Sequence, residues 1–359
     1  MSTVDGARRV LTEAIASRVF PGAAVEVGAA GGVLWSEALG TLTFDDGAEA
    51  AALGTLFDLA SLTKPIATAT VVMRLLHRTR LQLEETVASF FPEWLGADRE
   101  HVTVQDLLEH ASGLAARLVD PPPEGRREFE HDICTMLLEY PPRTRSAYSD
   151  LGFILVGFLA SDLAGVSLAT EFDAIWQELR TIDRTAVSQP LTFQLTRDER
   201  RRAAPTRPMA EDTRRGRRLA GEVHDNYAAA LGGVAGHAGL FGTAPAVGAF
   251  ARALLRAARG DPSLPAPLLP ALVARFTTRS AVPASSRTLG WDTMLPTSSC
   301  GEHMSPHAFG HVGFTGTSLW IDPARDRYFV LLTNRACSDG TLDEMRGVRR
   351  AFHDALADL

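Results

Sequence analysis

Two short segments near the start of the chain consist mostly of apolar and small residues and are strand-like. They are residues 23–28 and 33–39, with Gly31 and Gly32 between them. Two such segments joined across a glycine pair predict a β-hairpin. Residues 1–14 carry acids among spaced apolar residues, a pattern that predicts an amphipathic helix.

The pattern changes to a helical period in the middle of the chain. A short apolar run at 56–59 leads into a predicted helix from about Ser61 to Arg78, with Pro65 in its first turn, where a missing N–H costs little. Proline runs at 121–123 and 141–142 predict loops between later helices. The other predicted helices before residue 230 are 81–90, 103–110, 132–139, 151–164 and 168–179.

The last third of the chain returns to strand-like segments. A stretch of small residues at 228–243, which lets backbones approach closely, is followed by a predicted helix at 250–259 and a linker at 262–270. The predicted strands are 288–295, 308–314, 318–321 and 328–333, and a closing helix covers 341–356. Short links between consecutive strands favour an antiparallel sheet.

We therefore predict an α+β fold in which one antiparallel sheet, built from both chain ends, is flanked by helices and carries an inserted all-helical lobe. The predicted domains are residues 1–80 together with 240–359, as a discontinuous sheet domain, and residues 81–239, as a helical domain. Clefts between lobes are preferred places for small-molecule sites, so we expect the active site between these two domains.

Composition narrows the classes of partner. The chain has 359 residues, of which 45% are hydrophobic and 22% charged, as in ordinary globular proteins. Its net charge of −7 argues against nucleic acid as a partner. No long uncharged apolar run predicts a membrane helix, and the first residues contain no apolar signal core, so we expect a cytoplasmic protein, or a periplasmic one if a leader has been removed. The oligomeric state stays open.

Cysteine and arginine usage argue against a disulfide framework, a zinc site and an anion-binding patch. Cys134, Cys300 and Cys337 are odd in number and form no C-x-x-C pair, which argues against a disulfide framework and against zinc. Residues 197–218 are rich in arginine but also contain acids, and we favour a solvated surface loop there over an anion-binding patch.

One lysine is singled out by composition. The chain has 36 basic residues, and Lys64 is the only lysine among them, three positions after Ser61. On a helix these positions share a face, which would place an amine beside a hydroxyl. A serine needs a neighbour to take its proton, and a lysine whose pKa is lowered by burial or by a nearby cation can do so, whereas arginine cannot. The alternative is a helix cap and a surface charge, and S-x-x-K alone does not decide between the two.

Two other segments could contribute to the same site. Tyr148 precedes Ser149 and Asp150 at the start of an apolar helix, so it is either a proton-relaying phenol or a packed ring beside a helix cap. Residues 311–316 read as a strand edge, H-V-G-F-T-G, which is either a structural bend or part of the site. In the second case the glycine at 313 leaves room for substrate.

In combination, S-x-x-K, then Y-S-D, then H-x-G resemble the motifs of the serine β-lactamase and penicillin-binding-protein superfamily, in its class C β-lactamase-like branch. The resemblance spans nearly the whole chain and agrees with the predicted fold. Further stretches, at 107–114, 221–225 and 232–241, are similar to the penicillin-binding-protein-4B-like group of bacterial serine hydrolases.

The resemblance implies roles for the catalytic residues. Ser61 would be the acylated nucleophile and Lys64 its proton partner. Tyr148 would be the general base, with its pKa lowered by Lys64. Asp150 stands at a position that is often Asn, where it would orient Lys64 and contact the substrate amide. The N–H groups of Ser61 and Phe314 would form the oxyanion hole.

The third motif departs from the commoner pattern of the superfamily. His311, followed by Gly313, occupies the place of a lysine that recognises the carboxylate of penicillins and D-Ala-D-Ala ends. A neutral histidine supplies less positive charge, so the resemblance predicts weak or absent β-lactamase activity. His224 is a further candidate, for the wall of the cleft.

Other arrangements of the histidines fit less well. His303, His307 and His311 would suit a metal only on a helix, which the prolines and glycines among them oppose, and on a strand they are too far apart. His224, Asp225 and His237 suggest a Ser-His-Asp triad, but the chain has no G-x-S-x-G elbow. No phosphate loop or dinucleotide fingerprint appears, so we expect neither metal nor cofactor.

The sequence therefore predicts a serine hydrolase that acts through a Ser61 acyl-enzyme on small-molecule esters or on D-amino-acid amides and peptides. A β-lactamase is one alternative. An alternative of another class is a penicillin-binding sensor or scaffold that is acylated and then stalls.

Overall fold

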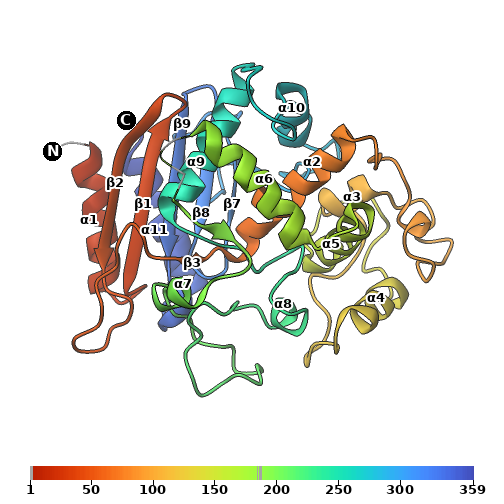
Figure 1. Cartoon of the computed structure of the whole chain (residues 1–359), viewed down its shortest axis with the longest axis horizontal. Helices are drawn as coiled ribbons and strands as arrows, with labels where there is room; N and C mark the ends of the chain where they lie inside the picture. Colours follow the sequence, from red (N-terminus) through yellow and green to blue (C-terminus); the bar gives the residue numbers. More distant parts are fainter. Residues whose placement is uncertain (1–2, 184, 186–187) are drawn as a thin grey trace.

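A computed structural model describes residues 3–183, 185 and 188–359. Its centre is a six-stranded antiparallel sheet with the strand order β2-β1-β9-β8-β7-β6 (Figure 1). The two ends of the chain meet in this sheet, because β1 pairs with β9 and sets Val25 opposite Leu331. The strands are β1 Gly22–Ala29, β2 Gly32–Gly40, β6 Asp292–Thr293, β7 Phe309–Val312, β8 Ser318–Asp322 and β9 Arg327–Thr333. The predicted fold class, with its sheet built from both ends, is confirmed.

Helices cover both faces of this sheet, as the alternation along β1 requires. Val25 and Val27 point into a cluster with the N-terminal helix α1 (Thr3–Ala16) and the C-terminal helix α11 (Leu342–Ala355). Glu26, between them, points to the other face, where Arg252 of α9 (Ala244–Ala258) donates to it at 2.7 Å. Figure 1 shows α9 on the opposite side of the sheet from α1 and α11.

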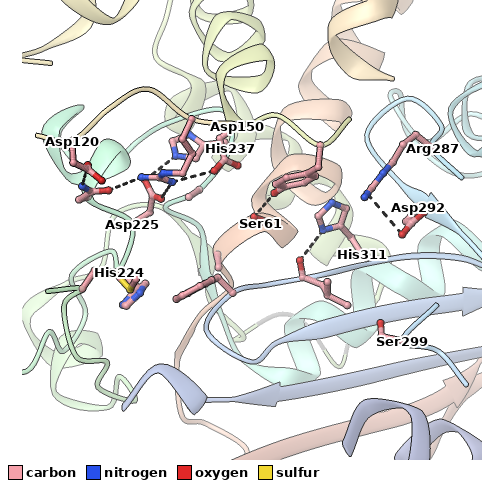
Figure 2. A pocket seen from close by; sticks show the side chains of 18 of the residues that line it. Ser61, Asp120, Asp150, His224, Asp225, His237, Arg287, Asp292, Ser299 and His311 are labelled. Atoms are coloured by element: carbon pink, nitrogen blue, oxygen red, sulfur yellow. Dashed lines mark hydrogen bonds and ion pairs between the residues drawn. The ribbon is translucent and has the colours of Figure 1, made fainter. Parts of the chain in front are cut away.

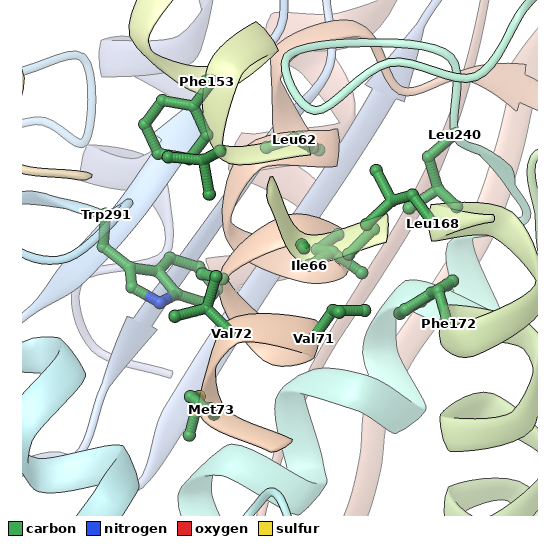
Figure 3. Packing of buried hydrophobic residues seen from close by; sticks show 14 of the residues in the cluster. Leu62, Ile66, Val71, Val72, Met73, Phe153, Leu168, Phe172, Leu240 and Trp291 are labelled. Carbon is green, nitrogen blue, oxygen red and sulfur yellow. The ribbon is translucent and has the colours of Figure 1, made fainter. Parts of the chain in front are cut away.

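The helical part of the chain lies at one end of the sheet (Figure 1). Its central helix, α5, begins after Ser149, whose hydroxyl accepts from the Gly152 N–H, and its residues 150–160 are all buried. Figure 3 shows Phe153 of α5 beside Leu62, with Trp291 from the C-terminal part of the chain in the same cluster. The helices here are α2 Thr70–His77, α3 Val104–Leu108, α4 Arg126–Thr135, α5 Asp150–Ala164 and α6 Leu168–Ile182.

Several predicted elements differ from the observed ones. Residues 81–90, predicted as a helix, form turns with only a short 3-10 helix, η3 Val87–Ser89, because the N–H of Val87 bonds to the carbonyl of Val102 instead of to its own segment. Of the strand predicted at 288–295, only β6 is present. The unpredicted elements are the small sheet of β3 Phe57–Asp58, β5 Phe241–Gly242 and β4 Leu191–Thr192, and the helices α7 Arg197–Arg201, α8 Asn226–Ala230, α10 Pro270–Thr277 and η4 Arg335–Cys337.

Three sequence-level expectations concern the whole chain. Cys134, Cys300 and Cys337 are buried free thiols, as expected. The domain boundaries after residues 80 and 239 stay predictions, because one hydrophobic cluster extends through both sets of segments. Within the described residues no single helix is long and apolar enough to span a membrane; only α5 and α6 together, bent by 75°, meet that criterion.

The small-residue stretch packs backbone against backbone, and we predict that Gly236→Ala destabilises the protein by about 3 kcal/mol. A Cβ at Gly236 would lie 1.9 Å from the carbonyl oxygen of Phe153 and 2.9 Å from the nitrogen of Gly157, so α5 would have to move. Urea unfolding measures the change. Gly347→Ala is the control, because its Cβ meets nothing within 4 Å. Equal unfolding midpoints for the two variants would contradict the packing described.

Candidate active site

Ser61 lies on a tight turn between β3 and the helix that follows. It is in a 3-10 turn, η1 Ala60–Leu62, which is continued by a π-helix, η2 Lys64–Ala69, and then by α2. Ala60 has a φ of 48°, in the left-handed region, and its N–H donates to Asp58 at 2.8 Å. The regular helix predicted from Ser61 is therefore wrong in its first turns, but the expected proximity is present, since Lys64 Nζ lies 3.1 Å from Ser61 Oγ.

Lys64 is fully buried and surrounded by oxygen atoms, which excludes the surface-charge alternative. Its Nζ contacts four acceptors, one more than it has protons. They are Ser61 Oγ at 3.1 Å, Tyr148 Oη at 2.5 Å, Asp150 Oδ1 at 2.7 Å and the carbonyl of His237 at 3.1 Å. Burial lowers the pKa of Lys64, but the charge of Asp150 and the contacts with Tyr148 outweigh burial, and the pKa is raised. The lowered pKa that the sequence suggested is not found.

Tyr148 completes the contact with the nucleophile. Its hydroxyl donates to Ser61 Oγ at 2.7 Å, from the segment just before α5. Burial raises the pKa of Tyr148, the charge of Asp150 adds to the effect, and Lys64 opposes it only in part. The resting site thus holds a neutral phenol and an ammonium, so the lowered phenol pKa expected from the resemblance is also not found. The pair becomes a base only after it loses one proton.

Asp150 connects this pair to a ring of alternating charges that the sequence did not predict. Its Oδ2 accepts from Arg117 at 3.1 Å, and Arg117 also donates to Asp225 at 2.7 Å. Asp225 in turn contacts the ring of His237 at 2.8 Å, and the His237 carbonyl returns to Lys64. The quoted motifs around 221–225 and 232–241 contain Asp225 and His237, but only the fold shows that Arg117 joins them.

Among the described residues, two of these acids and one histidine form a group whose spacing could suit a metal ion. Ligand atoms of Asp150, Asp225 and His237 lie within 4.8 Å of one another. Both carboxylates already face the cations of Lys64 and Arg117. The two carboxylates therefore already act as counter-ions for an ammonium and a guanidinium.

We predict that Asp150→Asn shifts the rise of kcat/KM with pH toward lower pH. The Asp150 charge raises the pKa of both Lys64 and Tyr148, so its removal lets the pair lose a proton at lower pH. Breaking the buried ion pair should also cost about 3 kcal/mol of stability. Rate profiles from pH 5 to 10 test the shift. The control is Asp292→Asn, which changes a pocket acid that has no contact with Lys64. A rise of kcat/KM at the same pH in both variants would contradict the prediction.

Residues 313–317, which include the predicted oxyanion donor Phe314, pack directly against the turn that carries Ser61. Thr315 donates to the carbonyl of Asp58 at 2.7 Å, and Thr317 donates to that of Leu59 at 3.0 Å. A Cβ on Gly313 would lie 2.1 Å from Thr317 Oγ1 and 2.6 Å from the Leu59 carbonyl oxygen. Gly313 is thus needed for this close approach, and it does not line the pocket, where it was expected to leave room for substrate. Phe314 does line it.

Both histidine candidates are buried, uncharged residues of the pocket wall. His311 contacts the carbonyl of Val312 through Nδ1 at 2.9 Å, and burial, with the charges of Arg287 and Lys64, holds its pKa well below the ordinary value. His224 stacks on Phe314 with ring centres 5.3 Å apart, and burial lowers its pKa to about 4. His311 therefore supplies no charge at neutral pH.

These residues surround a pocket of about 540 Å³. Figure 2 shows Ser61 between Arg287 on one side and Asp225 on the other. The pocket brings together most of the predicted site residues, and Lys64, which does not line it, is fully buried in contact with Ser61. Those that line it are Ser61, Tyr148, Asp150, His224, His311 and Phe314. Arg287 was missed by sequence reasoning, because it is one arginine among 35 and no motif marks it.

A serine hydroxyl in contact with a phenol and a buried amine, at the base of such a pocket, defines a serine hydrolase. The chain belongs to the beta-lactamase family, whose model matches residues 7–352. It is 30% identical to an N-acetylmuramyl-L-alanine amidase of Bacillus subtilis over 306 residues, which are 78% of this chain and 68% of that protein. It is 29% identical to a putative D-alanyl-D-alanine carboxypeptidase of Escherichia coli over 310 residues, which are 79% and 70%.

Solved structures agree with the fold. A class C β-lactamase from Rhodobacter sphaeroides superposes with a TM-score of 0.76 and 18% identity, over 98% of each chain. The family and this architecture together confirm the resemblance drawn from the three motifs.

Proposed function

We propose that this serine hydrolase cleaves D-amino-acid amides and peptides, and simple carboxylic esters, through an acyl-enzyme on Ser61, and that it turns over β-lactams weakly or not at all. The observation that carries the proposal is the three-way contact of Ser61, Lys64 and Tyr148.

In the first half-reaction Ser61 Oγ bonds to the substrate carbonyl carbon. Its proton passes to Tyr148, once the Lys64–Tyr148 pair has lost one proton. The N–H groups of Ser61 and Phe314 hold the oxyanion. The bond from carbon to the leaving nitrogen or oxygen then breaks, and Tyr148 returns the proton to that atom.

In the second half-reaction water attacks the Ser61 ester. Tyr148 takes a proton from the water and passes it to Ser61 Oγ as the ester bond breaks. The carboxylic acid leaves, and the enzyme is restored.

The positive charge near the pocket suggests which peptides bind. His311 is neutral, but Arg287 lines the same pocket and is held loosely, with its Nη1 3.8 Å from Asp292. Its guanidinium is thus able to pair with a carboxylate on the substrate. The names of the Bacillus and Escherichia relatives, an amidase and a putative D-alanyl-D-alanine carboxypeptidase, favour amide substrates.

A substrate panel tests the proposal. It contains p-nitrophenyl esters, D-Ala-p-nitroanilide, a D-Ala-D-Ala peptide, the same peptide as its C-terminal amide, and nitrocefin. We expect turnover of the esters and D-amino-acid substrates, a preference for the free acid over the peptide amide, and little nitrocefin hydrolysis. Efficient nitrocefin turnover would favour the β-lactamase alternative.

Intact mass after treatment with a fluorescent penicillin separates an enzyme from a sensor. Return of the native mass within the assay time, together with turnover on the panel, supports the hydrolase. A persistent adduct without turnover of any panel substrate would overturn the proposal in favour of a binder.

A further inference from the structure

A buried arginine lies behind the segment that carries the Phe314 N–H. Arg349 of α11 is 5% exposed, and its Nη2 donates to the carbonyl of Gly313 at 2.8 Å and to that of Thr317 at 2.9 Å. Burial and the charge of Arg335 lower its pKa to about 9, so it is a cation at neutral pH. No carboxylate of residues 3–183, 185 and 188–359 forms an ion pair with it. A buried cation without a paired carboxylate costs free energy of folding, so its position needs an explanation.

The reason lies in the peptide group that Arg349 contacts. The carbonyl of Gly313 and the N–H of Phe314 belong to one amide. A cation at the carbonyl oxygen draws electron density from the amide and makes its N–H a stronger donor, since linked hydrogen bonds polarise one another. The donor strengthened in this way is the one proposed to hold the oxyanion.

The other proposed oxyanion donor has the same arrangement. The N–H of Ser61 shares an amide with the carbonyl of Ala60, and Thr63 donates its hydroxyl to that carbonyl at 2.6 Å. Thr63 is fully buried and is itself held by the Leu240 N–H at 3.1 Å. Both amides thus carry a buried donor on their carbonyl side.

We propose that Arg349 is a positioning residue of the hydrolytic reaction, which strengthens the oxyanion hole by polarising and orienting the Gly313–Phe314 peptide from behind. This inference rests on the proposed function of Ser61 and Phe314. Arg349 touches neither substrate nor nucleophile, and it acts through the backbone.

Arg335 of η4 offers a matched control, because it donates to the backbone of the same segment. It is also buried, at 7% exposure, and its Nε and Nη2 donate to the carbonyl of Phe314 at 3.2 and 2.5 Å. That carbonyl shares its amide with the N–H of Thr315, so Arg335 does not polarise the Phe314 N–H through the peptide. A merely structural role for the two arginines predicts similar effects for both. Polarisation predicts an effect for Arg349 alone.

The test is the infrared carbonyl stretch of the acyl-enzyme, formed from an ester labelled with carbon-13 at the acyl carbon. Strong hydrogen bonds in the oxyanion hole lower this frequency. We expect Arg349→Met to raise it and to reduce kcat about tenfold with KM within about twofold, because one donor is weakened but not removed. Arg335→Met should leave the frequency at its wild-type value. Arg349→Gln, which keeps a neutral donor, should fall between Arg349→Met and wild type.

The outcomes separate this inference from the function on which it rests. No acyl-enzyme in the wild-type protein would overturn the proposed function itself. An acyl-enzyme whose carbonyl frequency is the same in wild type and in folded Arg349→Met or Arg349→Gln would overturn the role of Arg349 alone. The same shift in Arg335→Met would also overturn it, by showing a general effect of loop packing.

Discussion

Replacing Ser61 with alanine is expected to abolish covalent labelling by fluorophosphonate and by penicillin, and to reduce kcat by roughly 10⁵- to 10⁶-fold. The hydroxyl is the only one that contacts both Lys64 and Tyr148 among the described residues, at 3.1 and 2.7 Å. No other group could form the acyl bond in that position. Intact mass after labelling and the hydrolysis rate of a p-nitrophenyl ester measure the two effects.

A second serine of the same pocket provides the control. Ser299 lines the cavity but contacts neither the amine nor the phenol, so Ser299→Ala should keep both labelling and turnover within about twofold of wild type. A stoichiometric adduct in Ser61→Ala would show that the nucleophile lies elsewhere.

Lys64→Arg is expected to reduce kcat about 10³-fold, although the charge is kept. Four oxygen acceptors converge on one nitrogen in a fully buried position, and a planar guanidinium cannot place a single nitrogen among them. Arginine also cannot give up the proton that the Lys64–Tyr148 pair must lose before it acts as a base. Steady-state hydrolysis of an ester measures the loss of kcat, and unfolding curves show that the variant is folded.

The control exchanges the same two residue types in the opposite direction on the adjoining helix. Arg74 of α2 is buried and paired with Glu171 at 3.4 Å, so Arg74→Lys disturbs a buried charge without reaching Ser61. We expect its kcat to stay within about threefold of wild type. Equal losses in the two variants would mean that Lys64 matters only for folding.

Local patterns in the sequence predicted the parts of this molecule that depend on neighbouring residues. The strand-like segments at 23–28 and 33–39, with glycines between them, predicted β1 and β2 with their hairpin, and the spacing of Ser61 and Lys64 predicted their contact. That spacing held even though the helix begins as 3-10 and π turns, because residues three apart lie on one side of a 3-10 turn, and Ser61 lies in the 3-10 turn that leads to Lys64.

What the sequence did not predict depends on residues brought together from far apart. Arg117 meets Asp225, and Arg349 meets Gly313, across distances in the chain that no short motif spans. The direction of the pKa shift of Lys64 was missed although Asp150 was expected beside it, since only the structure shows that the contacts with Asp150 and Tyr148 outweigh burial. The helix predicted at 81–90 failed because tertiary contacts with 102–104 took its hydrogen bonds.

The pairing of β1 with β9 has a consequence for biosynthesis. The nucleophile is made early, but the central sheet cannot close until β9, at residues 327–333, has left the ribosome. The carbonyl that holds Lys64 and the loop that faces Ser61 are also made late, at residues 237 and 313–317. A nascent chain stalled before β9 therefore contains the catalytic residues but lacks the strand that pairs with β1, so we expect the site around Ser61 to assemble only when synthesis is nearly complete.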